Sequence, residues 1–427
     1  MLRLTFPGNL QRTLSELELP RSLDETFEWI FMGIRKSDRD LAHRLLQCLF
    51  VAARPLHIEE LAEIGAIDFD GAEEGTPRLV KGRRSENLQK DVLSICSSLI
   101  MVVDTGHSRV VQFSHFSVKE AFGRLANAPG DISRFHIIPE SAHTTLTQAC
   151  LATLLGLHDS SSNDQVERNF PLAGYASQHW VDHARSGMVS SRIEAGMRRL
   201  FDSTGPYFAT WLRLYNIDDH WNGFGNAWVA RGSPLYYASL CGFRDLAEHI
   251  INVSPEQINA TGGRRHSPLA AALCKAHFHV AELLLQHGAS VDVTDYNNQT
   301  LLQAASAEGR SDAVRWLVDH GADMHSQRND HVTLIHLAAA NGHSEVIQTL
   351  LKYGVDIDSA DNDGKTALHL ASSSGKVEIV RLLLEHGADA NLEDNDGYNP
   401  LSLTWTTEIE RLLLDHGASP QQAREQC

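Results

Sequence analysis

The chain has 427 residues, of which 42% are hydrophobic and 21% charged, and its formal net charge is −17. This length allows two or three domains, and the composition is that of an ordinary globular protein with a sizeable core. The excess of acid argues against a general binder of nucleic acid or of anionic membranes, because both ligands require clustered Lys and Arg.

The sequence carries no sign of secretion or of membrane insertion. Residues Met1–Leu10 lack the apolar run of a signal peptide, and no stretch approaches the ~20 uninterrupted apolar residues of a membrane span. The cysteines form no C-x-x-C pair and lie far apart, at Cys48, Cys96, Cys150, Cys241, Cys274 and Cys427. Since a chain of this length needs no disulfides, we expect buried thiols, a reducing compartment and a cytoplasmic location, with the nucleus as an alternative.

After an N-terminal segment, 1–21, the region 22–140 has a mixed pattern. Ser22-Leu-Asp-Glu25 is a capping box that predicts the start of a helix, and Ser37 is expected to cap a second helix. A third short helix is expected over Ile58–Ile67. A Gly- and charge-rich loop over 68–84 separates it from a fourth helix near Leu88–Leu99.

Two β-rich runs, 100–103 and 109–113, flank a turn and predict a hairpin. Three or four helices followed by a hairpin is the layout of a winged helix, a module that can in principle read DNA. The expected third helix carries Glu59, Glu60 and Glu63 and has no Lys or Arg. Phosphate contacts would be repulsive there, so we expect no nucleic-acid partner.

Residues 141–228 lie between this region and the repeats that follow. His179 and His183 are spaced as in the zinc motif H-E-x-x-H, but Trp180 stands where the general base would be. We therefore expect a core Trp180 between two partly exposed imidazoles. His277 and His279, expected in a loop further along, have no third metal ligand nearby in the sequence.

Residues 229–420 repeat with a fixed period, before a tail at 421–427. One marker recurs at spacings of 34, 33, 33, 33 and 33, at Ser233, Ser267, Thr300, Thr333, Thr366 and Asn399. A glycine marker recurs at spacings of 33, 33, 33 and 30, at Gly288, Gly321, Gly354, Gly387 and Gly417. Two markers in phase predict a repeat architecture. Within the best repeat, Thr366 is suited to cap a helix, and Leu368 is expected to be fully buried between helices of adjacent repeats.

The segment from Asp363-Gly-Lys-Thr-Ala-Leu-His369 to His386-Gly-Ala-Asp389 resembles the ankyrin repeat. The resemblance implies a solenoid of six helix pairs that binds proteins, and a structural role for His336 and His369 in linking neighbouring repeats. The first, second and sixth repeats depart from the pattern, with Tyr236 in place of His, Ala276 in place of Gly and a shortened unit that carries Trp405.

Most of the chain also resembles the rear half of fungal NACHT–ankyrin proteins, an NLR-like family. The resembling stretches are 54–62, 93–99, 111–120, 170–184 and 234–245. The resemblance implies a winged helix, an all-helical linker domain over residues 141–228 and ankyrin repeats, which an NTPase domain normally precedes. The chain departs from the family in having no P-loop: Gly364-Lys-Thr366 is the only G-K-T, with Ser359 where the first Gly should stand. It can be read as a short paralogue or as an incomplete gene model, and we expect no nucleotide cofactor.

The remaining chemical motifs are weak. Asp361-Asn-Asp363-Gly and Asp394-Asn-Asp396-Gly resemble parts of a calcium loop, but Leu370 and Leu403 stand where the bidentate Glu belongs. We interpret them as hairpin tips in which Asp363 and Asp396 support the turns. No G-x-S-x-G motif or activated Cys is present, so we expect neither catalysis nor a metal.

The sequence thus predicts a mainly α protein, an ankyrin solenoid after a winged helix and a helical linker, acting as a non-catalytic scaffold. Candidate partner-binding residues lie at hairpin tips and on inner helices: Tyr296, Asn297, Arg328, Asn329, Leu337, Asn341, Asp361, Asp363, Leu370, Ser374, Glu393, Asp394 and Asp396. Residues 330–420 hold 15 Asp and Glu against 5 Lys and Arg. The acidic tips therefore suggest a protein partner with a basic surface.

Two alternatives remain open: an NLR-like switch fragment that works with an NTPase supplied in trans, and a winged-helix DNA-binding regulator. An accessory role at a fungal immunity or secondary-metabolite locus fits the resemblance.

Overall fold

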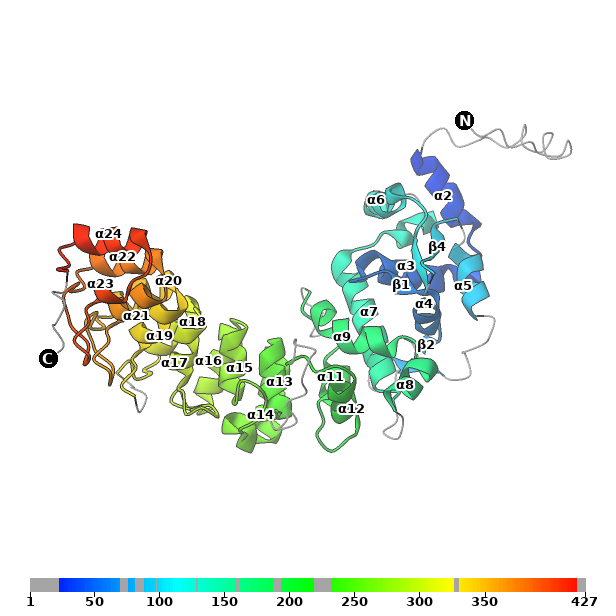
Figure 1. The fold of residues 1–427 in the computed structure, drawn as a ribbon. Coiled ribbons are helices and arrows are strands. Elements are labelled where there is room, and N and C mark those ends of the chain that lie inside the picture. The colour runs from blue at the N-terminus through cyan, green and yellow to red at the C-terminus, as the bar shows by residue number, and fades with distance from the viewer. Residues whose placement is uncertain are drawn as a thin grey trace, which may run out of the picture. The chain divides into compact units, whose positions relative to one another are not determined.

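The computed structural model describes residues 23–69, 76–80, 88–96, 98–106, 108–127, 130–157, 162–186, 193–218, 232–325 and 330–420. The chain forms two compact units, Met1–His220 and Trp221–Cys427, which are described separately (Figure 1). Within the ranges given, no helix is long and apolar enough to cross a membrane. The five cysteines that fall inside them are buried free thiols, as predicted, and burial raises the pKa of Cys96 to about 12. Cys427 lies outside the described residues.

The first unit opens with helices and a small sheet. The elements are α2 (Leu23–Gly33), η1 (Lys36–Asp38), α3 (Arg39–Val51), β1 (Leu56–His57), α4 (Ile58–Gly65), β2 (Ile67–Asp68), β3 (Arg78–Leu79), α5 (Leu88–Cys96), β4 (Ile100–Asp104) and β5 (Arg109–Phe113). The four helices and the hairpin confirm the predicted elements. Strand β1 joins the hairpin in an antiparallel sheet with the order β1-β5-β4, and β2 pairs with β3.

Two local predictions about helix starts have different outcomes. The capping box at Ser22 lies outside the described residues. Ser37 does not cap α3, because it lies inside η1, and Asp38 is the N-cap residue. Ser37 instead donates a hydrogen bond to the Asp38 carboxylate, over 2.9 Å.

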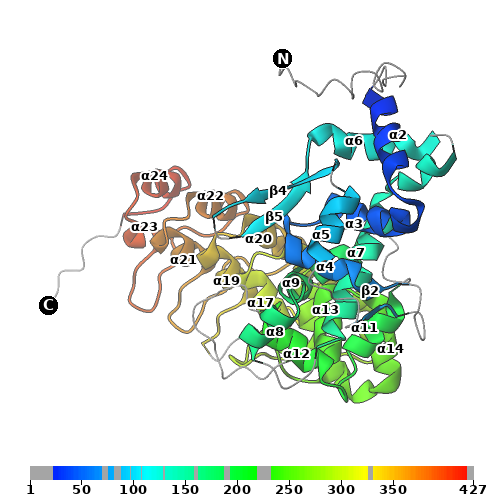
Figure 2. The ribbon, with the colours of Figure 1, turned by 90° about the vertical axis from the view of Figure 1, so that its right-hand side faces the viewer.

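The rest of the unit is helical and shares a core with the first part. It consists of α6 (Phe116–Arg124), η4 (Leu125–Asn127), η5 (Gly130–Phe135), α7 (Pro139–Leu154), α8 (Asn163–Asn169), α9 (Ala173–Ala184), α11 (Glu194–Leu200) and α12 (Tyr207–Leu214). Helix α7 packs against both α3 and α9, as Figures 1 and 2 show. The predicted linker helices are thus packed on the helices that precede them.

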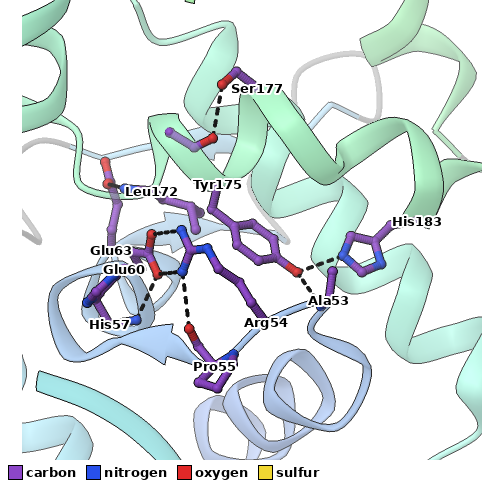
Figure 3. A network of polar contacts seen from close by, with 11 residues as sticks. Ala53, Arg54, Pro55, His57, Glu60, Glu63, Leu172, Tyr175, Ser177 and His183 are labelled. Carbon is purple, nitrogen blue, oxygen red and sulfur yellow. Dashed lines mark hydrogen bonds and ion pairs between the residues drawn. The ribbon is translucent and has the colours of Figure 1, made fainter. Parts of the chain in front are cut away.

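A buried polar network joins these two parts of the unit (Figure 3). The Arg54 guanidinium forms two bonds to the Glu60 carboxylate, of 2.7 and 2.9 Å, and lies over the Tyr175 ring. The Tyr175 hydroxyl accepts from the Ala53 amide at 2.9 Å and lies 2.8 Å from Nε2 of His183. Because each polar group has a partner, the network can be buried at little cost.

His183 ends the network on α9. Its Nδ1 lies 2.8 Å from Nδ1 of His143 on α7, and its side chain is buried. Trp180 is buried and His179 half-exposed, as predicted, but the expected exposure of His183 is wrong, because Tyr175 and His143 give its ring nitrogens partners inside the unit. Burial, with a smaller contribution from the neighbouring His143, lowers the pKa of His183 to about 4.

The described residues of the second unit form six helix pairs. They are α13 (Pro234–Cys241) with α14 (Arg244–Val253), α15 (Pro268–Cys274) with α16 (Phe278–Gln286), α17 (Leu301–Ala307) with α18 (Ser311–Asp319), α19 (Leu334–Asn341) with α20 (Ser344–Lys352), α21 (Ala367–Ser373) with α22 (Val377–Glu385), and α23 (Pro400–Leu403) with α24 (Thr407–Asp415); a 3-10 turn, η6 (Pro255–Asn259), follows the first pair. The repeating Ser, Thr and Asn residues stand at the N-caps of the first helix of each pair, as predicted for Thr366. Leu368 is fully buried, which confirms the predicted core face.

We predict that acid weakens the first unit through His183. The unfolded chain binds this proton near pKa 6.5 and the folded chain only near 4. The stabilisation is therefore complete above about pH 6.5 and is lost as pH falls toward 4, by about 3 kcal/mol in the unfolding free energy. Urea unfolding followed by the fluorescence of Trp180 and Trp211, at about pH 7 and pH 4, measures it. His183→Gln should reduce this pH dependence without abolishing it, because burial also lowers the pKa of His43, His143 and His179 in the same unit. An unchanged profile would show that His183 does not contribute.

We also predict that Leu368→Asp unfolds the C-terminal helix pairs. A buried carboxylate without a partner should cost more than the ~2–5 kcal/mol of a Leu→Ala cavity. Circular dichroism during thermal melting should show a loss of helix signal. Ser374→Asp, an exposed site on the same repeat, is the matched control and should melt like the wild type.

Candidate partner-binding surface

In several repeats, buried side chains link the repeat to the next along one edge of the solenoid. Nδ1 of His336 accepts from the Thr333 amide at 3.2 Å, and its Nε2 lies 2.9 Å from the carbonyl of Lys365 in the following repeat. His369 repeats the arrangement, with distances of 3.1 Å to the Thr366 amide and 3.1 Å to the Tyr398 carbonyl. Burial lowers the pKa of both rings, which keeps them neutral, as an accepting Nδ1 and a donating Nε2 require. These contacts confirm that the two histidines are structural.

The irregular first repeat makes the same kind of link with another residue. The Tyr236 hydroxyl accepts from the Arg265 amide of the second repeat at 3.0 Å. The ring fills the space beside Gly263, which has φ of +71°, and a Cβ there would lie 2.3 Å from the Tyr236 ring. Tyr236 therefore requires a glycine at position 263.

A second row of links runs along the turns between the two helices of each pair. His279 lies 3.1 Å from the Gly242 carbonyl and His343 2.9 Å from the Ala307 carbonyl, each in the preceding repeat. The exposed Trp405 donates from Nε1 to the Ser373 carbonyl at 3.1 Å and covers Gly375. His277 and His279 were expected in a loop; His279 instead lies in α16, and the buried His277 is its N-cap residue. In the parts of the chain described above, no three His, Cys, Asp or Glu side chains are placed to hold a metal.

At the hairpin tips, the first aspartate of each D-N-D-G holds the turn. Oδ1 of Asp361 accepts from the amides of Asp363 at 3.0 Å and Lys365 at 2.8 Å. Oδ1 of Asp394 accepts from the amides of Asp396 at 3.1 Å and Tyr398 at 2.8 Å. The expectation that Asp363 and Asp396 support the turns is therefore wrong. An Asp side chain bonds to amides further along the chain, so the earlier residue is the one that closes the turn.

The tips of successive repeats are stacked on one another. The Asn362 amide donates to the Asp330 carbonyl at 2.9 Å, and the Asn395 amide donates to the Asp363 carbonyl at 2.8 Å. Asp363, Glu393 and Asp396 are exposed, whereas Asp394 is buried. The exposed acidic residues are thus fewer than the sequence suggested, and two of them, Asp363 and Asp396, recur with the repeat.

The other candidates vary in exposure. Tyr296, Asn297, Asn341 and Ser374 are exposed, and Leu337, Leu370 and Asp361 are half-buried. Arg328 and Asn329 lie outside the described residues. The sequence analysis missed the exposed aromatic side chains of Tyr398 and Trp405, although an aromatic residue at a tip or in place of a missing segment is a usable signal.

The acidic helix of the first unit also differs from expectation. Glu60 and Glu63 are buried: Glu60 binds Arg54, and Glu63 accepts from the Leu172 amide at 2.6 Å. Only Glu59 is near the surface, paired with Arg109 at 2.8 Å. The argument that this helix would repel phosphate is therefore wrong for two of its three carboxylates, which face the interior.

The comparisons with known proteins identify the repeats. A family model described as ankyrin repeats, three copies, matches residues 235–328 and 335–424. The C-terminal part of the chain is thus an ankyrin-repeat solenoid, a fold that mediates protein–protein interaction. The chain is also 33% identical over 293 residues to the azaphilone pigments biosynthesis cluster protein L of Monascus ruber. That match covers 64% of this chain and 60% of the relative, so the chain spans less than two thirds of its length.

Solved structures similar to the chain include an ankyrin repeat domain from Acinetobacter baumannii AYE and the ankyrin repeat domain of Bcl-3, a member of the IkappaB protein family. The first is 34% identical, with a TM-score of 0.39, and the match covers 44% of this chain and 98% of that one. The second is 27% identical, with a TM-score of 0.40, and the match covers 44% and 87%.

The tip geometry predicts that substitution of Asp394 lowers stability and that substitution of Asp396 does not. Asp394→Asn should lower the melting temperature, because an uncharged oxygen replaces a buried carboxylate that accepts two amide hydrogen bonds, at a cost of about 1–3 kcal/mol. Asp396→Asn should leave it unchanged, because that side chain is exposed. Differential scanning calorimetry of both variants measures this, and equal losses would assign both residues to the turn.

Proposed function

We propose that the chain is a non-catalytic scaffold that binds a protein partner through its ankyrin repeats. The observation that carries this proposal is that, at the repeat edges, some residues hold the repeats together and others are exposed. Buried residues such as His336, His369 and Asp394 are used within the solenoid, whereas the side chains of Asp363 and Asp396 are exposed and are not the ones that bond to the turn amides. Surface positions that the fold does not need are free to be selected for binding.

We further propose that the partner presents a basic surface to the tips of the last repeats. Asp363 and Asp396 occupy equivalent positions in successive tips, with Glu393 nearby, and the three side chains are exposed. Asp363 has an intramolecular cation at 3.4 Å, Lys365, which is a weak surface pair. Clustered like charge lowers stability, and a basic partner offsets that cost while accelerating encounter.

For the first unit we propose a winged helix followed by helices that pack on it. What supports this is the order α3, β1, α4, α5 and the hairpin β4–β5, with β1 paired to β5. A gel shift at physiological salt tests DNA binding, and a pulldown with a P-loop NTPase tests the switch alternative.

We propose that the protein acts inside the cell and has an accessory role in a pathway encoded by a secondary-metabolite gene cluster. The support is the similarity to a protein named for an azaphilone pigment biosynthesis cluster. The alternative is an accessory role at an immunity locus. Co-expression of the gene with a neighbouring biosynthetic cluster would support the first proposal, and its absence would favour the alternative.

The binding proposal predicts a measurable electrostatic effect. The triple variant Asp363→Asn, Glu393→Gln, Asp396→Asn should bind the partner captured by the full chain with a slower on-rate and a weaker salt dependence. Surface plasmon resonance at two or more salt concentrations measures both quantities.

A charge-matched control separates steering from net charge. Asp245, Glu256 and Glu385 are exposed outside the tips, so Asp245→Asn, Glu256→Gln, Glu385→Gln should retain the wild-type on-rate. If affinity, on-rate and salt slope are unchanged in the tip variant, the acidic tips take no part in binding.

A further inference from the structure

One junction in the solenoid is built differently from the others. Neighbouring inner helices pack closely at α13–α15, α17–α19, α19–α21 and α21–α23, but α15 and α17 do not. A cavity of about 270 Å³ lies at this second-to-third repeat junction. Leu273, Leu301 and Leu317 contribute apolar surface to it, and the remaining lining is rich in charged groups.

Arginine side chains dominate the charge of this cavity. Arg265 and Arg310 both pair with Glu308, with 2.7 Å from the Arg310 Nε to the carboxylate, and Arg310 also donates to the Cys274 carbonyl. Arg264 stands exposed among the lining residues. The only other acid in the lining, Asp295, uses its carboxylate for the amides of Asn297 and Gln299, at 2.8 and 2.9 Å.

The two paired guanidiniums retain bonding capacity. A guanidinium has five N–H donors. Glu308 and the Cys274 carbonyl together use one donor of Arg265 and two of Arg310. Both arginine side chains are only about one quarter to one third exposed, at 25% and 35%. Donors held in a partly dry cavity bind a carboxylate more strongly than donors on an open surface.

We propose that this junction is a recognition pocket for an acidic side chain of the protein partner. The carboxylate of a partner Asp or Glu would bind between Arg265 and Arg310, and its apolar neighbours would contact the leucines. The proposal deepens the scaffold function and rests on it. Under this proposal the second and third repeats attract an acidic group of the partner, and the last tips attract a basic one.

The experiment selects a random 12-residue peptide library on the immobilised full chain. The peptides that bind should be enriched in Asp or Glu next to an apolar residue. A fluorescein-labelled copy of the best acidic peptide then reports Kd by fluorescence anisotropy. Arg265→Gln and Arg310→Gln should each weaken its binding about tenfold.

The distinguishing variant is Glu308→Gln. It removes the internal competitor for both guanidiniums, so it should tighten the acidic peptide several-fold while Arg310→Gln weakens it. A purely structural role for this ion-pair network predicts losses in both. Arg315→Gln, an exposed arginine on the outer helix α18, is the control and should not change Kd. Circular dichroism checks that each variant is folded.

Three outcomes overturn the pocket: peptides without acidic enrichment, acidic peptides that bind the arginine variants as well as the wild type, and weaker binding to Glu308→Gln. The capture experiment with the tip variant tests the scaffold separately, because it leaves Arg265 and Arg310 intact. If the full chain captures a partner but the peptide library shows no enrichment of Asp or Glu, the scaffold function is supported and the pocket is rejected.

Discussion

Helix pairs of the solenoid are joined to their neighbours by side-chain hydrogen bonds that a single pair cannot make alone. In the fourth and fifth repeats the inner helix begins at a Thr whose amide is bonded by a buried His, and the other ring nitrogen of that His reaches the carbonyl of the next repeat. A pair separated from its neighbour would leave this nitrogen and that carbonyl without partners. Because unpaired buried polar groups are costly, the repeats are stable only as a stack.

Departures from the repeat pattern follow from the same requirement. Tyr236 replaces His and still bonds to the next repeat, through a hydroxyl oxygen that accepts from the Arg265 amide, provided that residue 263 is a glycine. Trp405 replaces the shortened turn of the sixth repeat and still donates to the preceding one. Arg310 does so at the junction where the inner helices lie apart, and the space left there becomes the charged cavity. Irregular repeats are therefore where the solenoid acquires shape and charge that its regular repeats lack.

The sequence predicted the elements well because periodicity and capping are local properties. The repeat period, the buried Leu368 and the four N-terminal helices could all be derived from spacing. Strand β1 could not, because two residues give no alternation, and it exists only through its pairing with β5. The burial of His183 and Glu63 could not either. Their partners, His143 and the Leu172 amide, lie 40 and 109 residues away and come close only in the folded unit.

The roles of the tip aspartates show a different limit. Composition gives Asp361 and Asp363 the same charge, but only the first can reach the amides that close the turn. Charge counted from the sequence therefore overstates the acid that a partner would meet. The same holds at the cavity between the second and third repeats, where Glu308 offsets part of the charge of two arginines. The field that orients a partner is set by the charges that the fold leaves uncommitted. The net charge of the chain therefore does not describe the field that a partner meets. That field is more positive at the junction between the second and third repeats, and less negative at the last tips, than a net charge of −17 implies.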